Sequence, residues 1–142
     1  MSFRLQQLDA PARVLMSLLF LISGYGKLTA SSATQAYMEA YHVPGILVWP
    51  AAVWELGAGL LLVVGLWVRP LAILLASWCV LTALIFHTDF ADQNQMINFL
   101  KNLTMAGGFI LIARNGAFGL SVDGLLAAHK DAPAARAAAG RA

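Results

Sequence analysis

The stretch ILVWPAAVWELGAGLLLVVGLW, from Ile46 to Trp67, decides the class of fold, because Glu55 is its only charged residue. A helix of about 20 apolar residues matches the thickness of the hydrocarbon core of a bilayer. Backbone groups in lipid must be hydrogen-bonded internally, and this stretch does not alternate as a barrel strand would. Trp49 and Trp67 bracket it in the manner of interface anchors. The stretch therefore predicts a membrane-spanning helix.

The composition of the whole chain agrees with this interpretation. Of its 142 residues, 60% are hydrophobic and 11% are charged, and the mean hydropathy is +0.73. A soluble domain has about 25% charged residues. These values exclude an ordinary cytosolic enzyme, a disordered chain and a disulfide scaffold, and a net charge of +2 does not indicate a nucleic-acid partner. The single cysteine, Cys79, excludes an internal disulfide and CxxC chemistry.

Three further apolar stretches accompany the first, so we predict an all-α integral membrane four-helix bundle. The expected spans are residues 13–28, 46–68, 70–87 and 96–114, within one domain of residues 1–125. The Ala-rich segment 126–142 is expected to be a disordered cytoplasmic tail. A cleaved signal peptide is the alternative for the first stretch, but Asp9 and Pro11 fit its basic n-region poorly.

The distribution of basic residues predicts the orientation. With four spans, both termini and the turn between the second and third spans share one side of the membrane. Seven of the nine Lys and Arg residues fall on that side: Arg4, Arg13, Arg69, Arg114, Lys130, Arg136 and Arg141. Both termini are therefore expected in the cytoplasm. We also expect a tight hairpin at residues 68–70 and a short helix lying on the membrane at Ser32–His42.

Three charged residues inside the spans need a partner or a purpose, since each costs roughly 2.5–3.5 kcal/mol to insert. They are Lys27, Glu55 and Lys101. Helix rise places all three about 7–9 Å from the outer boundary of the membrane. His87 is expected just above this level, and Asn102 lies beside Lys101 on α-helical spacing with Asn98. We predict that these residues form one polar level in the outer half of the bundle.

Two interpretations of the polar level remain open. Glu55 can form a buried ion pair with Lys27 or Lys101 that only fixes helix packing. One carboxylate cannot neutralise two ammonium groups, however, so the second lysine favours a site for a quinone headgroup, a sulfur oxyanion or a lipid phosphate. Alternatively, a lysine can extend to the lipid phosphates. His87 is then either an interface residue or a proton-handling group.

No metal site is expected. His42, His87, Asp89 and Asp92 do not have the spacing of a metal-binding motif. Cys79 is expected in the core, in the middle of its span and far from the polar level.

The chain resembles the DoxX family of small bacterial four-helix membrane proteins over about residues 10–125. The segments that carry the resemblance are Ser23–Leu28 (SGYGKL), Glu55–Gly59 (ELGAG), Gly65–Pro70 (GLWVRP), His87, Leu100–Leu103 (LKNL) and Gly107–Gly108. The resemblance implies a location in the bacterial cytoplasmic membrane. It also implies that Lys27, Glu55, Lys101 and Asn102 occupy the characteristic positions of the family.

The resemblance implies two classes of function. Members of the family include a subunit associated with thiosulfate:quinone oxidoreduction and a protein linked to superoxide detoxification. We therefore expect a membrane component of a quinone-linked redox, sulfur-oxidation or oxidative-stress system. The alternative is a non-enzymatic accessory or assembly protein whose ion pair is structural, and a small-solute permease is disfavoured because no span is broken.

The expected partners follow from these two classes, and whether the chain is itself an enzyme is left open. They are the lipid bilayer, a quinone or small anion, other membrane or redox proteins, and a second copy of the chain. The chain has neither a redox pair of cysteines nor a pair of haem-ligating histidines within the bundle. A quinone or a partner protein would therefore have to carry any electrons.

Overall fold

The computed structural model describes residues 8–117 and 120–139, and every regular element in those ranges is helical. This confirms the all-α prediction. The elements in chain order are α2 (Asp9–Thr29), α3 (Ser31–Ala40), the 3-10 turn η1 (Gly45–Leu47), α4 (Val48–Val64), α5 (Val68–Phe86), α6 (Gln93–Asn115) and α7 (Val122–Ala139).

Three of the described helical segments are long and apolar enough to cross a membrane: Gly45–Val64, Val68–Phe86 and Gln93–Asn115. α2 and α3 meet the same criteria only when taken together, across a bend of 101°, and the pair is then a fourth span that is broken or a re-entrant segment, whereas an unbroken span was expected. The short helix expected at Ser32–His42 is present as α3. The expected four-helix membrane bundle is therefore consistent with the described helices.

Three helices, α2, α5 and α6, begin earlier than expected, and interactions in the first turn accompany the earlier starts of α2 and α6. α2 begins at Asp9, whose carboxylate pairs with Arg13 at 3.1 Å, and Pro11 is tolerated in the first turn because its missing N–H would have no partner there. α6 begins at Gln93 because the Asp92 side chain accepts the backbone N–H of Asn94 at 2.8 Å.

A tight turn joins α4 and α5 as expected, but it lies at residues 65–67 rather than 68–70, because α5 already begins at Val68. Gly65 ends α4 with a φ of +73°, and its N–H donates to the Leu61 carbonyl at 3.0 Å. A left-handed residue at this position satisfies the last carbonyls of a helix, and glycine adopts it without a Cβ penalty. Trp67 also has a positive φ, of 52°, and α5 begins directly after it at Val68.

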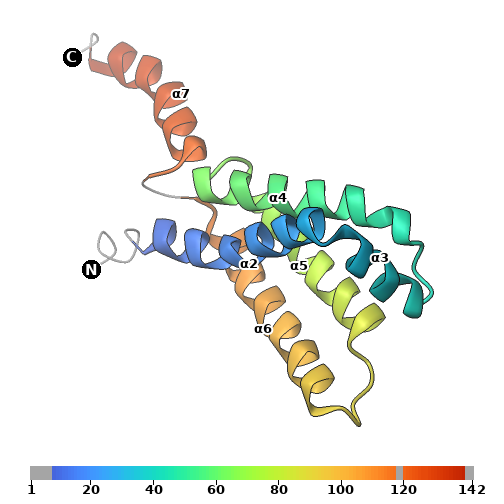
Figure 1. Cartoon of the computed structure of the whole chain (residues 1–142). Coiled ribbons are helices and arrows are strands. Elements are labelled where there is room, and N and C mark those ends of the chain that lie inside the picture. The colour runs from blue at the N-terminus through green and yellow to red at the C-terminus, as the bar shows by residue number, and fades with distance from the viewer. Residues whose placement is uncertain (1–7, 118–119, 140–142) are drawn as a thin grey trace.

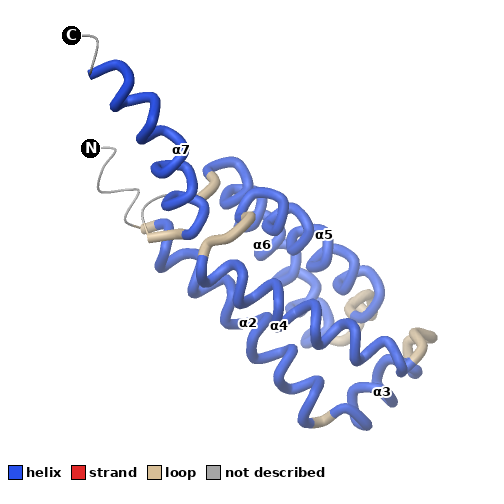
Figure 2. Tube along the Cα trace, turned by 90° about the horizontal axis from the view of Figure 1, so that it is seen from above, coloured by secondary structure: helices blue, strands red, loops and turns tan. Residues whose placement is uncertain are grey.

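The helices are arranged as two pairs. α2 packs along α4, and α5 packs along α6. The two pairs meet in the half of the molecule that contains the α4–α5 hairpin, and they diverge toward α3 (Figure 1). Figure 2 shows α2 and α4 side by side, with α3 folded back from the far end of α2. The buried core lies where the pairs meet and includes Phe20, Leu62, Leu75 and Phe109.

A network of hydrogen bonds fastens the hairpin end of the molecule. Arg13 is completely buried and donates to the carbonyls of Leu62 at 2.8 Å, Val63 at 3.0 Å and Leu120 at 2.7 Å. The Asp123 carboxylate accepts the backbone N–H groups of Trp67 and Val68, both at 2.9 Å. Cations at the C-terminus of a helix and anions at an N-terminus complement the helix dipole. Arg13 does so for α4 and Asp123 for α5.

The tail differs from the expectation. A disordered segment was expected from residue 126, but α7 continues to Ala139, while residues 140–142 lie outside the described residues. Alanine has the highest intrinsic helix propensity, which accounts for a helix in this Ala-rich segment. In Figure 1, α7 extends away from the bundle.

Candidate functional site

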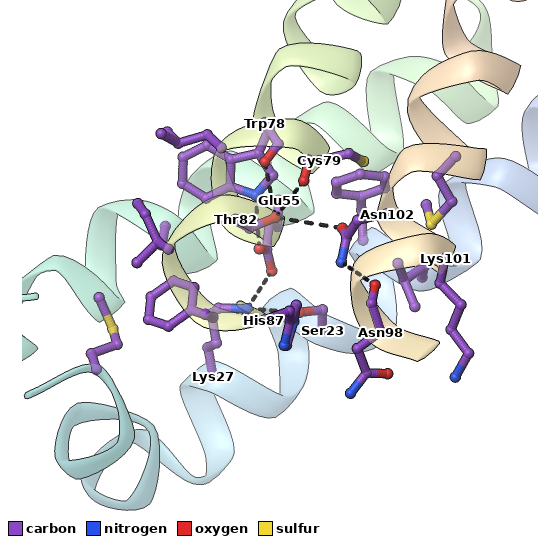
Figure 3. A pocket seen from close by; sticks show the side chains of 18 of the residues that line it. Ser23, Lys27, Glu55, Trp78, Cys79, Thr82, His87, Asn98, Lys101 and Asn102 are labelled. Carbon is purple, nitrogen blue, oxygen red and sulfur yellow. Dashed lines mark hydrogen bonds and ion pairs between the residues drawn. The ribbon is translucent and has the colours of Figure 1, made fainter. Parts of the chain in front are cut away.

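A cavity of about 1190 Å³ lies between the two helix pairs, at the end where they diverge. Residues from α2, α3, α4, α5 and α6 line it, and Figure 3 shows its polar side chains from close by. Most of the wall is apolar, with Leu19, Phe20, Met38, Ile85, Ile97 and Met105 among the lining residues. A predominantly apolar cavity with a few polar groups is typical of a ligand-binding site.

The main polar group of the cavity is an ion pair between α2 and α4. Glu55 is 4% exposed, and its Oε2 lies 2.8 Å from the Nζ of Lys27. The same ammonium group donates to Ser23 Oγ at 2.6 Å. Glu55 Oε1 accepts a hydrogen bond from the indole N–H of Trp78 on α5, at 3.1 Å. Both carboxylate oxygens are therefore hydrogen-bonded.

This pairing explains how a carboxylate can be held inside the bundle. Removing an ion from water costs several kcal/mol even after relaxation, and only close pairing with further hydrogen bonds offsets that cost. Glu55 has one ammonium partner and one indole partner. The expected ion pair is thus formed with Lys27, the first of the two candidate lysines.

Lys101 does not join this pair. It is exposed on α6 and borders the cavity, and in Figure 3 its side chain points away from Glu55. Helix rise fixes the depth of a residue but not the direction in which its helix turns it. The three charges expected at one level are therefore divided into a paired Lys27–Glu55 and a separate Lys101.

Asn102 faces the cavity from the other helix pair. Its amide nitrogen donates to the Asn98 carbonyl at 3.0 Å. Its amide oxygen lies 3.5 Å from Thr82 Oγ1, and that hydroxyl makes shorter contacts with the Trp78 carbonyl at 2.9 Å and the Cys79 carbonyl at 3.1 Å. A hydroxyl has one proton to donate. The Asn102 oxygen and its second N–H are therefore available to a ligand.

His87 lies at the end of α5 and contributes to a polar connection with α3. Its Nδ1 lies 2.7 Å from Gln95 Oε1, and Gln95 Nε2 donates to the hydroxyl of Tyr41 at 3.4 Å. His87 also lines the cavity. Among the described residues, no group of three or more His, Cys, Asp or Glu side chains is placed to hold a metal ion.

Aromatic contacts hold α3 over this end of the cavity. The rings of Tyr37 and Tyr41 lie 5.6 Å and 5.5 Å from the ring of Phe86. The Tyr37 hydroxyl donates to the Phe86 carbonyl at 3.5 Å. Burial, followed by a hydrogen bond with Tyr41, raises the pKa of Tyr37 above its ordinary value. The hydroxyl therefore stays protonated and able to donate at neutral pH.

The sequence-based prediction missed one residue of the site and misplaced another. Trp78 was not singled out, although a tryptophan inside a span needs an acceptor for its N–H, and this was the available signal. The expectation that Cys79 lies in the core is confirmed, since it is buried in the hydrophobic core. It was also expected far from the polar residues, but it lines the same cavity as Glu55. That expectation was wrong because the cavity extends from the ion pair into the core where the helix pairs meet.

The neighbouring Trp54 has an indole nitrogen that is buried and has no acceptor among the described residues. Its ring lies 6.3 Å from that of Trp78 in an edge-to-face arrangement, and both rings line the cavity. The ion pair is thus flanked by two indoles from different helix pairs.

Comparison with known proteins identifies the relatives of this chain. The family model described as DoxX matches residues 8–88. The chain is 43% identical over 115 residues to "Inner membrane protein YqjF" of Escherichia coli (strain K12), covering 81% of this chain and 88% of the relative. It is 36% identical over 119 residues to "Inner membrane protein YphA" of the same organism, covering 79% and 85%. No solved structure matches the chain.

Proposed function

The chain belongs to the DoxX family, and on that premise we propose that it is an inner-membrane protein whose cavity binds a quinone headgroup. The role is that of a membrane component in a quinone-linked redox, sulfur-oxidation or oxidative-stress system. The inner-membrane location is supported by the names of both relatives and by the apolar helices that can span a bilayer.

The observation that carries the proposal is a buried ion pair inside a large apolar cavity. A quinone ring is flat and apolar and carries two carbonyl oxygens that accept hydrogen bonds. An ammonium group has three N–H donors. Lys27 uses two of them, for Ser23 and Glu55, so one remains for a ligand. Asn102 has a free N–H on the facing wall, and the indoles of Trp54 and Trp78 offer aromatic surfaces.

The chain's own residues would bind and orient the ring rather than carry electrons. Lys27 would hold one carbonyl oxygen, and Glu55 would hold the ammonium group in position. Cys79 is the only cysteine of the chain, so no dithiol is available for electron transfer. Electrons would therefore enter and leave through a quinone and a partner protein.

The orientation forms part of the same proposal. The excess of basic residues at the hairpin end and the termini supports a cytoplasmic location for both. The ion pair, His87 and α3 would then lie in the outer half of the bilayer.

Quinone titration of the purified protein in lipid nanodiscs tests the proposal. We expect saturable ubiquinone binding by the wild type, and about tenfold weaker binding by Lys27→Met and by Asn102→Leu, because neither replacement side chain has a hydrogen-bond donor. Glu39→Gln is the matched control, since Glu39 is exposed and does not line the cavity. A wild-type protein without saturable binding, or folded variants that bind as the wild type does, would refute the proposal.

A second candidate is a non-enzymatic assembly protein, and one observation favours it. The hydrogen bonds of the ion pair go to partners within the chain, Ser23 and Trp78, as they would in a purely structural network. Glu55→Gln separates the two candidates. If Glu55→Gln folds normally but no longer binds quinone, the result supports the binding site. If the wild type binds no quinone and Glu55→Gln fails to accumulate, the result supports the structural role.

A further inference from the structure

The contacts between α2 and α6 are concentrated at one level of the bundle. The rings of Phe20 and Phe109 meet edge to face at 5.6 Å. The terminal methyl of Met16 lies against Gly108, where it would be 3.0 Å from an added Cβ. Both contacts lie below the ion pair, toward the hairpin end. They form the floor of the cavity between these two helices.

From the level of this floor outward, the cavity wall is open between α2 and α6. Leu19 of α2 and Leu100 of α6 both line the cavity, yet they are 51% and 54% exposed. Lys101 and Thr104 line it as well and are also exposed. Residues that border a cavity and are exposed at the outer surface mark a place where the two are continuous. We call the opening bordered by Leu19, Leu100, Lys101 and Thr104 the α2–α6 gap.

The other sides of the cavity are crossed by direct contacts. α3 covers the end of the cavity through the packing of Tyr37 and Tyr41 on Phe86. Exposed Leu47 and Leu81 border the side between α4 and α5. On that side, however, the Trp78–Glu55 hydrogen bond and the contact of Trp78 with Trp54 run from helix to helix.

The α2–α6 gap lies on two helices that we treat as membrane spans, so it faces hydrocarbon rather than water. Only hydrophobic molecules reach such an opening. Lys101 adds one ammonium group at its edge, where it can attract an oxygen-bearing headgroup as it passes. The gap therefore selects for a molecule with both a hydrocarbon tail and a polar head.

We infer that ligands enter the cavity from within the bilayer through the α2–α6 gap, and that they are long-tailed amphiphiles. The polar head lies at Lys27 and Glu55, while the hydrocarbon tail remains in the gap and extends into the lipid. The identity of the polar head rests on the proposed function. The entry route and the hydrocarbon tail are inferred from the α2–α6 gap alone.

Fluorescence quenching by lipid tests the route without requiring a quinone. A protein with Trp78 as its only tryptophan (Trp49→Phe, Trp54→Phe and Trp67→Phe) is placed in phosphatidylcholine brominated on its acyl chains. Trp78 lines the cavity, so acyl chains that enter the gap should quench it. Thr104→Phe should reduce this quenching about twofold, because a phenyl ring in the gap displaces the chain atoms that make contact there.

Two further variants keep this test decisive. Leu100→Phe blocks the same gap independently, in case Thr104→Phe does not fold. Leu111→Phe is the matched control, since Leu111 is 57% exposed on the same helix and does not line the cavity. Unchanged quenching of Trp78 in every folded gap variant would overturn the inference. It would also be overturned if Leu81→Phe, on the α4–α5 side, reduced the quenching while the gap variants did not.

The same protein is then titrated with long-tailed ubiquinone, which separates the two proposals. Gap-dependent quenching by lipid without quinone binding rejects the quinone headgroup and retains the route. Quinone binding at an unchanged rate in Thr104→Phe and Leu100→Phe rejects the route and retains the quinone site. A slower approach to saturation in both gap variants, but not in Leu111→Phe, supports both.

Discussion

Trp78 donates its indole N–H to Glu55 across 3.1 Å, and this bond joins α5 of one helix pair to α4 of the other. At the same carboxylate, Lys27 supplies the ion pair from α2. Three helices thus meet at one side chain. Because the helix pairs diverge around it, Glu55 is both the charged centre of the cavity and one of the links that hold the pairs together.

Loss of the Trp78 donor should destabilise the protein measurably. Trp78→Phe retains most of the ring but leaves Glu55 Oε1 without its hydrogen bond, and a buried unsatisfied acceptor costs about 1–3 kcal/mol. Denaturant unfolding in detergent measures the change. Trp49→Phe is the control, since Trp49 is 43% exposed. Equal stability of the two variants would show that the bond contributes nothing.

Removing one partner of the ion pair should lower the free energy of unfolding strongly, whereas replacing both partners should lower it only a little. Lys27→Met leaves a buried carboxylate unpaired, and removal of one partner of a buried pair typically costs about 3–5 kcal/mol. Lys27→Met combined with Glu55→Gln should recover most of that loss. Unfolding of the two single variants and the double variant gives the coupling energy, and additive effects would contradict a direct interaction.

Gly65 should not tolerate a side chain. Its φ of +73° is unfavourable for other residues, and an added Cβ would lie 2.5 Å from the Cβ of Ser121 and 2.6 Å from Arg13 Nη1. Gly65→Ala should lower the free energy of unfolding by more than about 1 kcal/mol, since strain and collision add. Gly57→Ala is the matched control, because an added Cβ there meets nothing within 4 Å. A similar loss in both variants would contradict this assignment.

Asp123 should stabilise the hairpin by capping α5 from a distant part of the chain. Asp123→Ala leaves the N–H groups of Trp67 and Val68 without their acceptor, and loss of such a cap costs about 0.5–2 kcal/mol. Asp123→Asn retains one oxygen acceptor and should lose less. The unfolding midpoint should decrease from the wild type to Asp123→Asn to Asp123→Ala. An Asp123→Ala variant as stable as the wild type would contradict this expectation.

The orientation can be tested with reporter fusions. A fluorescent reporter after Ala142 should be active, because it folds in the cytoplasm, whereas alkaline phosphatase inserted in the loop between α5 and α6 should be active outside. The basis is the excess of Lys and Arg on the side of the termini. An active phosphatase at the C-terminus would contradict the proposed orientation.

The sequence by itself determined the helices and much of the polar chemistry. Apolar length predicted the spans, and the short linker predicted the tight hairpin between α4 and α5, while the left-handed conformation of Gly65 came from the structure. Counting helix rise placed Lys27 and Glu55 at one depth, and they form an ion pair. These features depend on local periodicity and on distance along a helix axis, and both can be calculated from the order of residues.

Only the tertiary structure decided which of these side chains meet. The rotation of each helix about its axis depends on packing with its neighbours, and for this reason Lys101 lies on an exposed face while Trp78 reaches Glu55. The pairing of α2 with α4 and of α5 with α6 leaves the cavity between them, and no local pattern records that divergence. Asp123 and Arg13 likewise act on backbone groups far away in the chain, which only the folded arrangement brings within hydrogen-bonding distance.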